Sequence, residues 1–94
     1  MFILSLTYLK SNGEADRYME AHMAWVKDGY ARGWFLASGR KVPRTGGAIL
    51  AIGDRTAIEA YVAADPFIIH GVAAYDITEL AVTTTVEDLE ILKR

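Results

Sequence analysis

Apolar and polar side chains alternate along the start of the chain. The even-numbered residues from Phe2 to Tyr8 are all apolar or aromatic, and the odd-numbered residues from Ile3 to Leu9 are half apolar. This alternation predicts a strand over residues 2–9 that is buried on both faces. A turn follows, in which Ser11 and Glu14 have the spacing of a capping box and so mark the approach of a helix.

The period then changes to the 3.6 residues of an amphipathic helix, which we predict over residues 15–32. Its apolar stripe contains a histidine, His22, which lies near the centre of the stripe between Tyr18 and Val26. The opposite side of the helix is charged. Gly33 is placed to end the helix at the position after the C-cap, where glycine is favoured.

The rest of the chain divides into shorter segments. Asp54 is a candidate N-cap, and the pair Asp65-Pro66 ends the helix that it begins, because a residue before proline is disfavoured in helical geometry. The predicted elements are a strand over 34–40, a strand over 47–53, a helix over 54–64, one helical turn over 66–70 and a strand over 72–82. Residues 85–94 suit either a short helix or a strand.

This order of elements, βαββαβ, is that of ferredoxin-like α+β folds. It predicts a four-stranded antiparallel sheet with both helices on one face. The other face would then be too large and too apolar to leave exposed to water, and a second copy of the chain is the simplest cover. We therefore expect a homodimer.

Composition restricts the class of protein further. The 94 residues are 52% hydrophobic and 23% charged, which suits one compact domain over 1–94. There is no cysteine, so disulfides and thiolate metal sites are excluded. Ten Lys and Arg against twelve Asp and Glu give no basic footprint for nucleic acid, and no apolar run reaches the ~18 residues of a membrane span. We expect a cytoplasmic protein that binds neither nucleic acid nor membrane.

His22 and Asp65 are the residues best suited to chemistry. A histidine in an apolar stripe is either a core residue with both nitrogens satisfied or the wall of a cleft. Asp65, directly before a proline, has the position of an N-cap, and this role alone explains its presence. If the fold brings the two together, the carboxylate would accept the imidazole N–H and fix its tautomer, leaving the other nitrogen as a base. The sequence leaves both roles open.

Two other groups of polar residues are candidates for a site. His70 is one, although a histidine also suits a helix C-terminus for electrostatic reasons. The basic loop 40–45 leads into Gly46-Gly47, and the Arg44 guanidinium with the glycine amides could hold a carboxylate. A solvated hairpin tip would have the same composition. No nucleotide, metal or serine-nucleophile motif is present, so we expect no cofactor and no metal.

Five sequence strings, taken in order, resemble one known family. MFILSLTY, AHMAW, FLASG, PRTGGAILA and ADPF followed by GVAAYDITE are similar to the YciI-like (YCII-related domain) family over nearly the whole chain. The resemblance implies a dimeric α+β barrel with a pocket that holds a His–Asp pair. The family histidine corresponds to His22 and the family aspartate to Asp65. Ser38 and Gly39 correspond to the start of the family's Ser-Gly-Pro turn, where Arg40 replaces the proline.

Two classes of function fit these residues. The first is a cofactor-free enzyme that moves a proton on a small cyclic or aromatic organic acid or phenol, as a lyase, isomerase or dehydrochlorinase does. Its base would be His22, its orienting partner Asp65, and its substrate contacts Ser38, Gly39, Arg44 and Gly46. The second class is a ligand-binding or structural dimer without turnover, in which His22 and Asp65 form a buried polar link. Haem binding through His22 would require a cavity larger than a chain of this length is expected to enclose.

Overall fold

The computed structural model describes residues 1–94 and contains the predicted α+β fold. The elements are β1 (Phe2–Tyr8), α1 (Asn12–Arg17), α2 (Met19–Ala31), β2 (Phe35–Arg40), β3 (Gly46–Ala51), α3 (Arg55–Ala63), α4 (Pro66–Ile69), β4 (Ala73–Glu79) and a 3₁₀ helix, η1 (Glu87–Lys93). The four strands form one sheet in the order β2-β3-β1-β4, and every neighbouring pair is antiparallel. This arrangement confirms the ferredoxin-like prediction.

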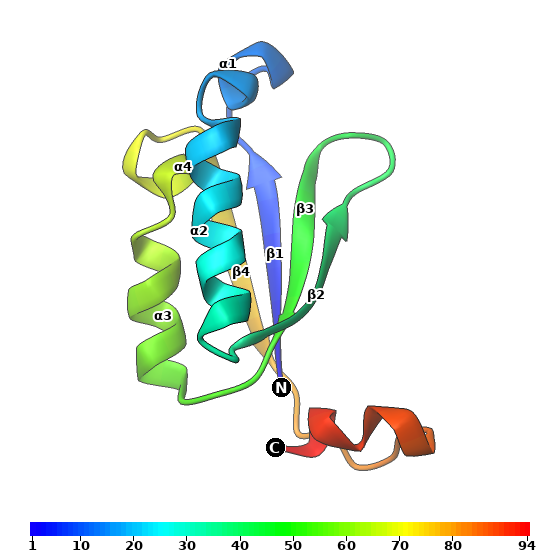
Figure 1. The fold of residues 1–94 in the computed structure, drawn as a ribbon. Coiled ribbons are helices and arrows are strands. Elements are labelled where there is room, and N and C mark those ends of the chain that lie inside the picture. Colours follow the sequence, from blue (N-terminus) through cyan, green and yellow to red (C-terminus); the bar gives the residue numbers. More distant parts are fainter.

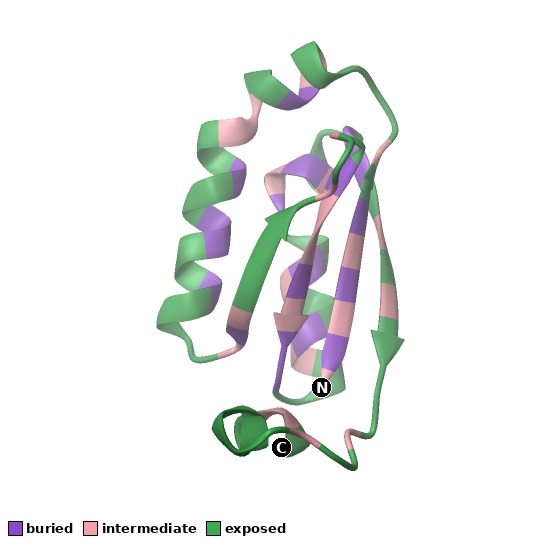
Figure 2. Cartoon of the chain, turned by 90° about the vertical axis from the view of Figure 1, so that its right-hand side faces the viewer, coloured by how far each residue is buried: buried purple, intermediate pink, exposed green.

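The helices cover one face of the sheet, and the core lies between the two layers. Figure 1 shows α2 and α3 side by side, to the left of β1, β3 and β2. The even-numbered residues of β1 point into this layer and are the most buried, and in Figure 2 the buried parts of α2 face the strands. The largest core cluster is Phe2, Leu4, Trp25, Val26, Phe35, Ile49, Ala51, Ile58 and Val62. The opposite face of β1, predicted to be buried, is half-buried at Ile3 and Ser5 and exposed at Thr7 because no element of this chain covers it.

The helix ends follow the capping signals of the sequence. The Ser11 hydroxyl accepts a hydrogen bond from the Glu14 amide at 3.2 Å, and the Asp54 carboxylate accepts one from the Ala57 amide at 3.1 Å. Gly33 follows the C-cap of α2 with φ of +77°, a left-handed conformation that glycine adopts without steric cost.

The predicted helix over 15–32 is wrong in one respect. The helix starts earlier, at Asn12, and is interrupted at Tyr18, whose φ and ψ of −113° and 7° are not helical. The apolar period continues across Tyr18, so the sequence pattern carried no sign of the interruption. The break leaves α1 free to bury Ala15 against a second cluster around Phe67 while α2 packs on the main core.

The last strand is shorter than predicted, ending at Glu79 instead of residue 82. Its partner β1 begins at Phe2, and the final backbone bonds of this edge join Leu80 to Met1. The chain leaves the sheet there and forms η1 away from it (Figure 1). None of the helices combines the length and the apolar character needed to cross a bilayer.

A glycine inside α2 provides a test of how tightly the helix packs. A methyl group at Gly29 would overlap the ring of Phe35 in β2. Alanine is normally better than glycine inside a helix by about 1 kcal/mol, but inserting atoms into a packed core costs about 1–3 kcal/mol. We expect Gly29→Ala to lower the free energy of unfolding by about 1–2 kcal/mol, measured by urea denaturation with tryptophan fluorescence.

Gly13 in α1 is the matched control, because a methyl group there meets nothing closer than 3.8 Å. Gly13→Ala should leave the free energy of unfolding unchanged or raise it by up to about 1 kcal/mol. Equal destabilisation by both substitutions would contradict the proposed packing of α2 on β2.

Candidate functional site

His22 projects from the first turn of α2 toward the start of α4. Its Nδ1 lies 2.8 Å from Oδ1 and 3.0 Å from Oδ2 of Asp65. The imidazole stacks on the ring of Phe67, with ring centres 4.0 Å apart and an angle of 4° between the planes. His22 is 8% exposed and Asp65 is fully buried. Stacking and hydrogen bonding together fix the orientation of the imidazole.

Asp65 also has the capping role that its position before Pro66 predicts. Its Oδ1 accepts a hydrogen bond from the Phe67 amide at 2.9 Å, and Pro66 occupies the first helical position of α4. The two interpretations of Asp65 are therefore compatible, since one carboxylate caps α4 and contacts His22. The helix N-terminus adds a favourable field for this negative charge.

Tyr75, in β4, is a third member of the site that the sequence did not identify. Its hydroxyl donates a hydrogen bond to Oδ2 of Asp65 at 2.7 Å. Burial, together with the neighbouring Asp65 carboxylate, holds the pKa of the Tyr75 hydroxyl well above its ordinary value, because both disfavour a phenolate. Tyr75 is therefore a neutral donor at neutral pH. Strand alternation alone places it on the helical side of the sheet, but nothing in the sequence reveals its partner.

The hydrogen-bond network assigns the tautomer of His22. The Phe67 amide and the Tyr75 hydroxyl both donate to Asp65, so its oxygens act as acceptors. The His22 Nδ1 facing them therefore carries the hydrogen. Its Nε2 makes no hydrogen bond within the chain, while the side chain lines an open cavity. In the neutral imidazole, the nitrogen that accepts hydrogen bonds is therefore Nε2.

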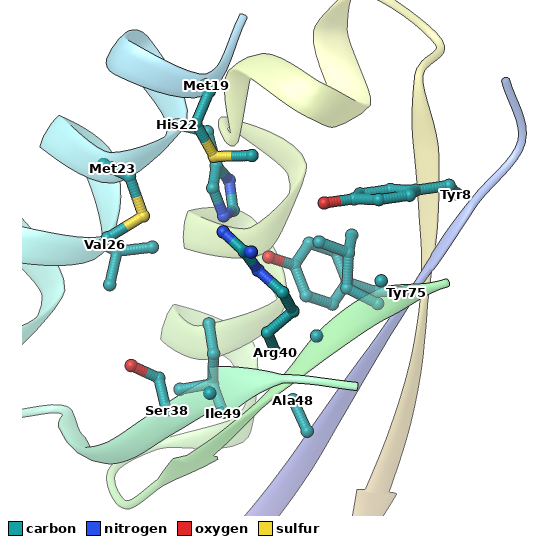
Figure 3. Close-up of a pocket in the computed structure, with 14 residues that line it drawn as sticks. Tyr8, Met19, His22, Met23, Val26, Ser38, Arg40, Ala48, Ile49 and Tyr75 are labelled. Atoms are coloured by element: carbon teal, nitrogen blue, oxygen red, sulfur yellow. The ribbon is translucent and has the colours of Figure 1, made fainter. Parts of the chain in front are cut away.

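The cavity lies between α2 and the strands β2, β3 and β1 and has a volume of ≈ 240 Å³. Figure 3 shows His22, Met19 and Met23 on the helical side of it and Ser38, Arg40 and Ile49 on the strand side. Its complete lining is Leu6, Tyr8, Met19, His22, Met23, Val26, Ser38, Gly39, Arg40, Gly46, Gly47, Ala48, Ile49 and Tyr75. This space suits a ligand of about one ring, since pockets for drug-sized molecules start near 300 Å³, and it is too small for haem.

Of the predicted substrate contacts, Ser38, Gly39 and Gly46 line this cavity and Arg44 does not. The Nη2 atom of Arg44 donates to Oδ1 of Asp16 at 2.5 Å, and its guanidinium lies over the ring of Tyr8. These contacts with α1 and β1 hold Arg44 outside.

Arg40 takes the place in the cavity that was predicted for Arg44. The reason is a β-bulge between Phe35 and Ala37, which inserts one extra residue into β2. The bulge reverses the alternation, so that Ser38 and Arg40 face the helices. Simple alternation counted from Phe35 would put both on the opposite face.

His70 lies outside the cavity. It caps the C-terminus of α4 and stacks on the ring of Tyr18, with ring centres 4.2 Å apart. No group of three His, Asp or Glu side chains converges in a way that could hold a metal ion.

Comparison with known proteins agrees with this fold. The chain resembles the solved structure of 5-chloro-2-hydroxyhydroquinone dehydrochlorinase (TftG) from Burkholderia phenoliruptrix AC1100, determined in complex with 2,5-dihydroxybenzoquinone. The TM-score is 0.68 and the sequence identity 16%, and the match covers 85% of this chain and 93% of that chain. At this identity the likeness establishes the fold.

Sequence comparison identifies the family. No curated protein matches the chain. Residues 1–81 match the family described as the YCII-related domain, which confirms the resemblance found in the sequence strings. Since this match covers most of its length, the chain belongs to the YCII-related domain family.

Proposed function

We propose that this protein is a small cofactor-free enzyme that transfers a proton on a small cyclic or aromatic organic acid or phenol. The observation that carries the proposal is the orientation of His22, whose Nδ1 is held by Asp65 while its Nε2 is left to the cavity. A positioned imidazole of this kind contributes roughly 10²–10⁴-fold to a proton-transfer rate.

In this proposal the residues around His22 have separate tasks. His22 Nε2 is the general base. Asp65 holds the tautomer and stabilises the imidazolium that forms when Nε2 takes a proton. Tyr75 is a positioning residue, because its hydroxyl fixes Oδ2 of Asp65. Ser38, Gly39 and Gly46 would contact the substrate at the strand side of the cavity.

The reaction step follows from these tasks. Nε2 takes a proton from a ring carbon next to a carbonyl group, and the electron pair of the broken C–H bond moves toward the carbonyl oxygen to form an enolate. Return of the proton to another carbon gives an isomerase. Loss of a leaving group such as chloride from the adjacent carbon gives a lyase, and the proton stays on His22 until solvent removes it.

The similarity to TftG supports a small aromatic or cyclic substrate, but it does not identify one particular molecule. That protein is a dehydrochlorinase named for a chlorinated hydroxyhydroquinone, and its ligand 2,5-dihydroxybenzoquinone is a single ring with acidic hydroxyl groups. A molecule of this size suits a cavity of ≈ 240 Å³. The alternative is a non-catalytic protein in which His22 and Asp65 are only a buried polar link.

We also propose that the chain works as a homodimer, joined through the sheet face without helices. The strand register places Leu50, Ile3, Ala37 and Thr78 in one row on that face. Small and apolar side chains predominate there, and no element of this chain covers them. A stable interface buries at least about 1,200 Å² in total, which a sheet face of this kind can supply.

The catalytic role of His22 can be separated from its structural role with His22→Asn. The asparagine amide can still donate to Asp65, but it has no basic nitrogen to replace Nε2. We expect the melting temperature to change by only a few degrees, about the effect of 1 kcal/mol. The assay is deuterium exchange in D₂O, followed by NMR, with 2,5-dihydroxybenzoquinone and a panel of phenols and lactones as substrates. We expect the substitution to lower the exchange rate by about 10²–10⁴-fold.

Two outcomes of this experiment count against the enzyme. The first is an absence of exchange or elimination above the buffer rate with any member of the panel for the wild-type protein, which would favour the non-catalytic alternative. The second is an equal rate in His22→Asn and wild type, which would assign the chemistry elsewhere.

Tyr75→Phe tests whether the buried hydroxyl is part of the site. Removing a donor from a buried carboxylate costs about 1–3 kcal/mol, so the melting temperature should fall by roughly 4–20 °C. Tyr30→Phe is the matched control, because the Tyr30 hydroxyl bonds Ser38 at 2.7 Å in an exposed position. Its loss should cost less than about 1 kcal/mol. Equal effects in scanning calorimetry would contradict the role of Tyr75.

The dimer is tested by placing a charge on the open sheet face. Leu50→Glu should give a particle of one chain by light scattering at micromolar concentration, whereas wild type should give twice that mass. Val42→Glu makes the same chemical change at a loop residue that is 96% exposed, and it should remain dimeric. A wild-type particle with the mass of one chain would refute the proposal.

A further inference from the structure

Arg40 is the one permanently charged side chain in the cavity. The lining contains no Asp or Glu, and its other titratable groups are His22 and two tyrosines. Four other arginines pair with carboxylates: Arg17 with Glu14, Arg32 with Asp28, Arg44 with Asp16, and Arg55 with Glu59 and Glu79. Arg40 makes no such pair. The cavity therefore carries an uncompensated positive charge.

The sheet register directs this charge toward the proposed base. Arg40 is opposite Gly47, which is opposite Leu6, which is opposite Tyr75, so the four residues form one row on the helical side. Gly47 contributes no side chain to this row. Figure 3 shows Arg40 pointing from β2 into the same space as His22 and Tyr75.

Asp16, an acidic group that lies within electrostatic range of Arg40, already has a partner. Asp16 accepts a hydrogen bond from Arg44, which is the main reason that the pKa of its carboxyl lies below the ordinary value, and Arg40 adds a smaller electrostatic contribution. Arg40 is thus close enough to lower the pKa of Asp16 electrostatically, but it forms neither an ion pair nor a hydrogen bond with Asp16. Its guanidinium remains available for a ligand.

We propose that Arg40 anchors the substrate, and that the cavity selects single-ring organic anions whose carboxylate or phenolate pairs with it. The inference rests on the function proposed above, since it concerns the same cavity. A guanidinium presents two parallel N–H groups that match a carboxylate. The ring would then lie against Met19, Met23 and Ile49, with its far side toward His22 Nε2.

The anchor also explains how a shallow cavity could orient its ligand. The apolar walls contact any ring in many orientations, whereas a single cation at one end favours the orientation that places the anion there. Arg40 would therefore determine which carbon faces the base. This makes Arg40 a specificity-determining residue, distinct from the residues that move the proton.

Binding of benzoate and benzamide tests the anchor without requiring turnover. The two probes have nearly the same shape, but only benzoate is charged at neutral pH. We would titrate each into ¹⁵N-labelled wild type, Arg40→Gln and Arg40→Lys and follow the amide signals of Gly46 and Gly47. Wild type should prefer benzoate to benzamide. Arg40→Gln should weaken benzoate binding by about tenfold, leave benzamide unchanged, and be partly rescued in Arg40→Lys.

Lys41→Gln is the matched control, because it removes the adjacent positive charge, which contacts Thr7 and lies outside the cavity lining. Its benzoate affinity should remain within about twofold of wild type, since Lys41 does not line the cavity. Melting curves of the variants check that they fold.

The outcomes separate this inference from the proposed enzyme. Benzoate affinity that is the same in wild type and Arg40→Gln, an equal loss for benzamide, or failure of both probes to bind wild type would each overturn the anchor. Arg40-dependent binding of benzoate, together with an absence of proton exchange, would support the anchor while refuting the enzyme.

Discussion

The buried carboxylate of Asp65 is the interaction on which the rest of this structure depends. Moving an isolated carboxylate out of water costs several kcal/mol, so a fully buried one persists only if its oxygens are satisfied. Here the donors come from three separate elements: His22 in α2, the Phe67 amide in α4 and the Tyr75 hydroxyl in β4. The charge thereby joins both helical segments to an edge strand of the sheet.

This arrangement makes the site part of the core. The stacked rings of His22 and Phe67 lie within a fold that also depends on Phe67 for its second hydrophobic cluster. The same contacts that stabilise the join between α2 and α4 therefore hold the imidazole in one orientation. The orientation of the imidazole therefore depends on core contacts and not on a surface loop.

The sequence predicted the parts of the molecule that depend on local pattern. The strand and helix order, the caps at Ser11, Asp54 and Asp65, and the position of His22 in the buried stripe all follow from periodicity and side-chain chemistry. Parts that depend on a change of register or on a distant partner were not predictable. The bulge in β2 turns the side chain of Arg40 to the helical face of the sheet. The ion pair with Asp16 holds Arg44 outside the cavity. The hydrogen bond from the Tyr75 hydroxyl to Asp65 joins residues that only the tertiary fold brings together.

The row from Arg40 to Tyr75 has a consequence for how such cavities diversify. Its members stand on four neighbouring strands, and strands in a sheet are separated by about 4.8 Å. The distance between the backbones at the two ends of the row is therefore set by the strand spacing, and a point substitution cannot alter it. Only the reach of the side chain at each position is free to vary. Exchange of the side chain at position 40 would therefore change the free length of the cavity, while Tyr75 at the other end of the row stays fixed by its hydrogen bond to Asp65.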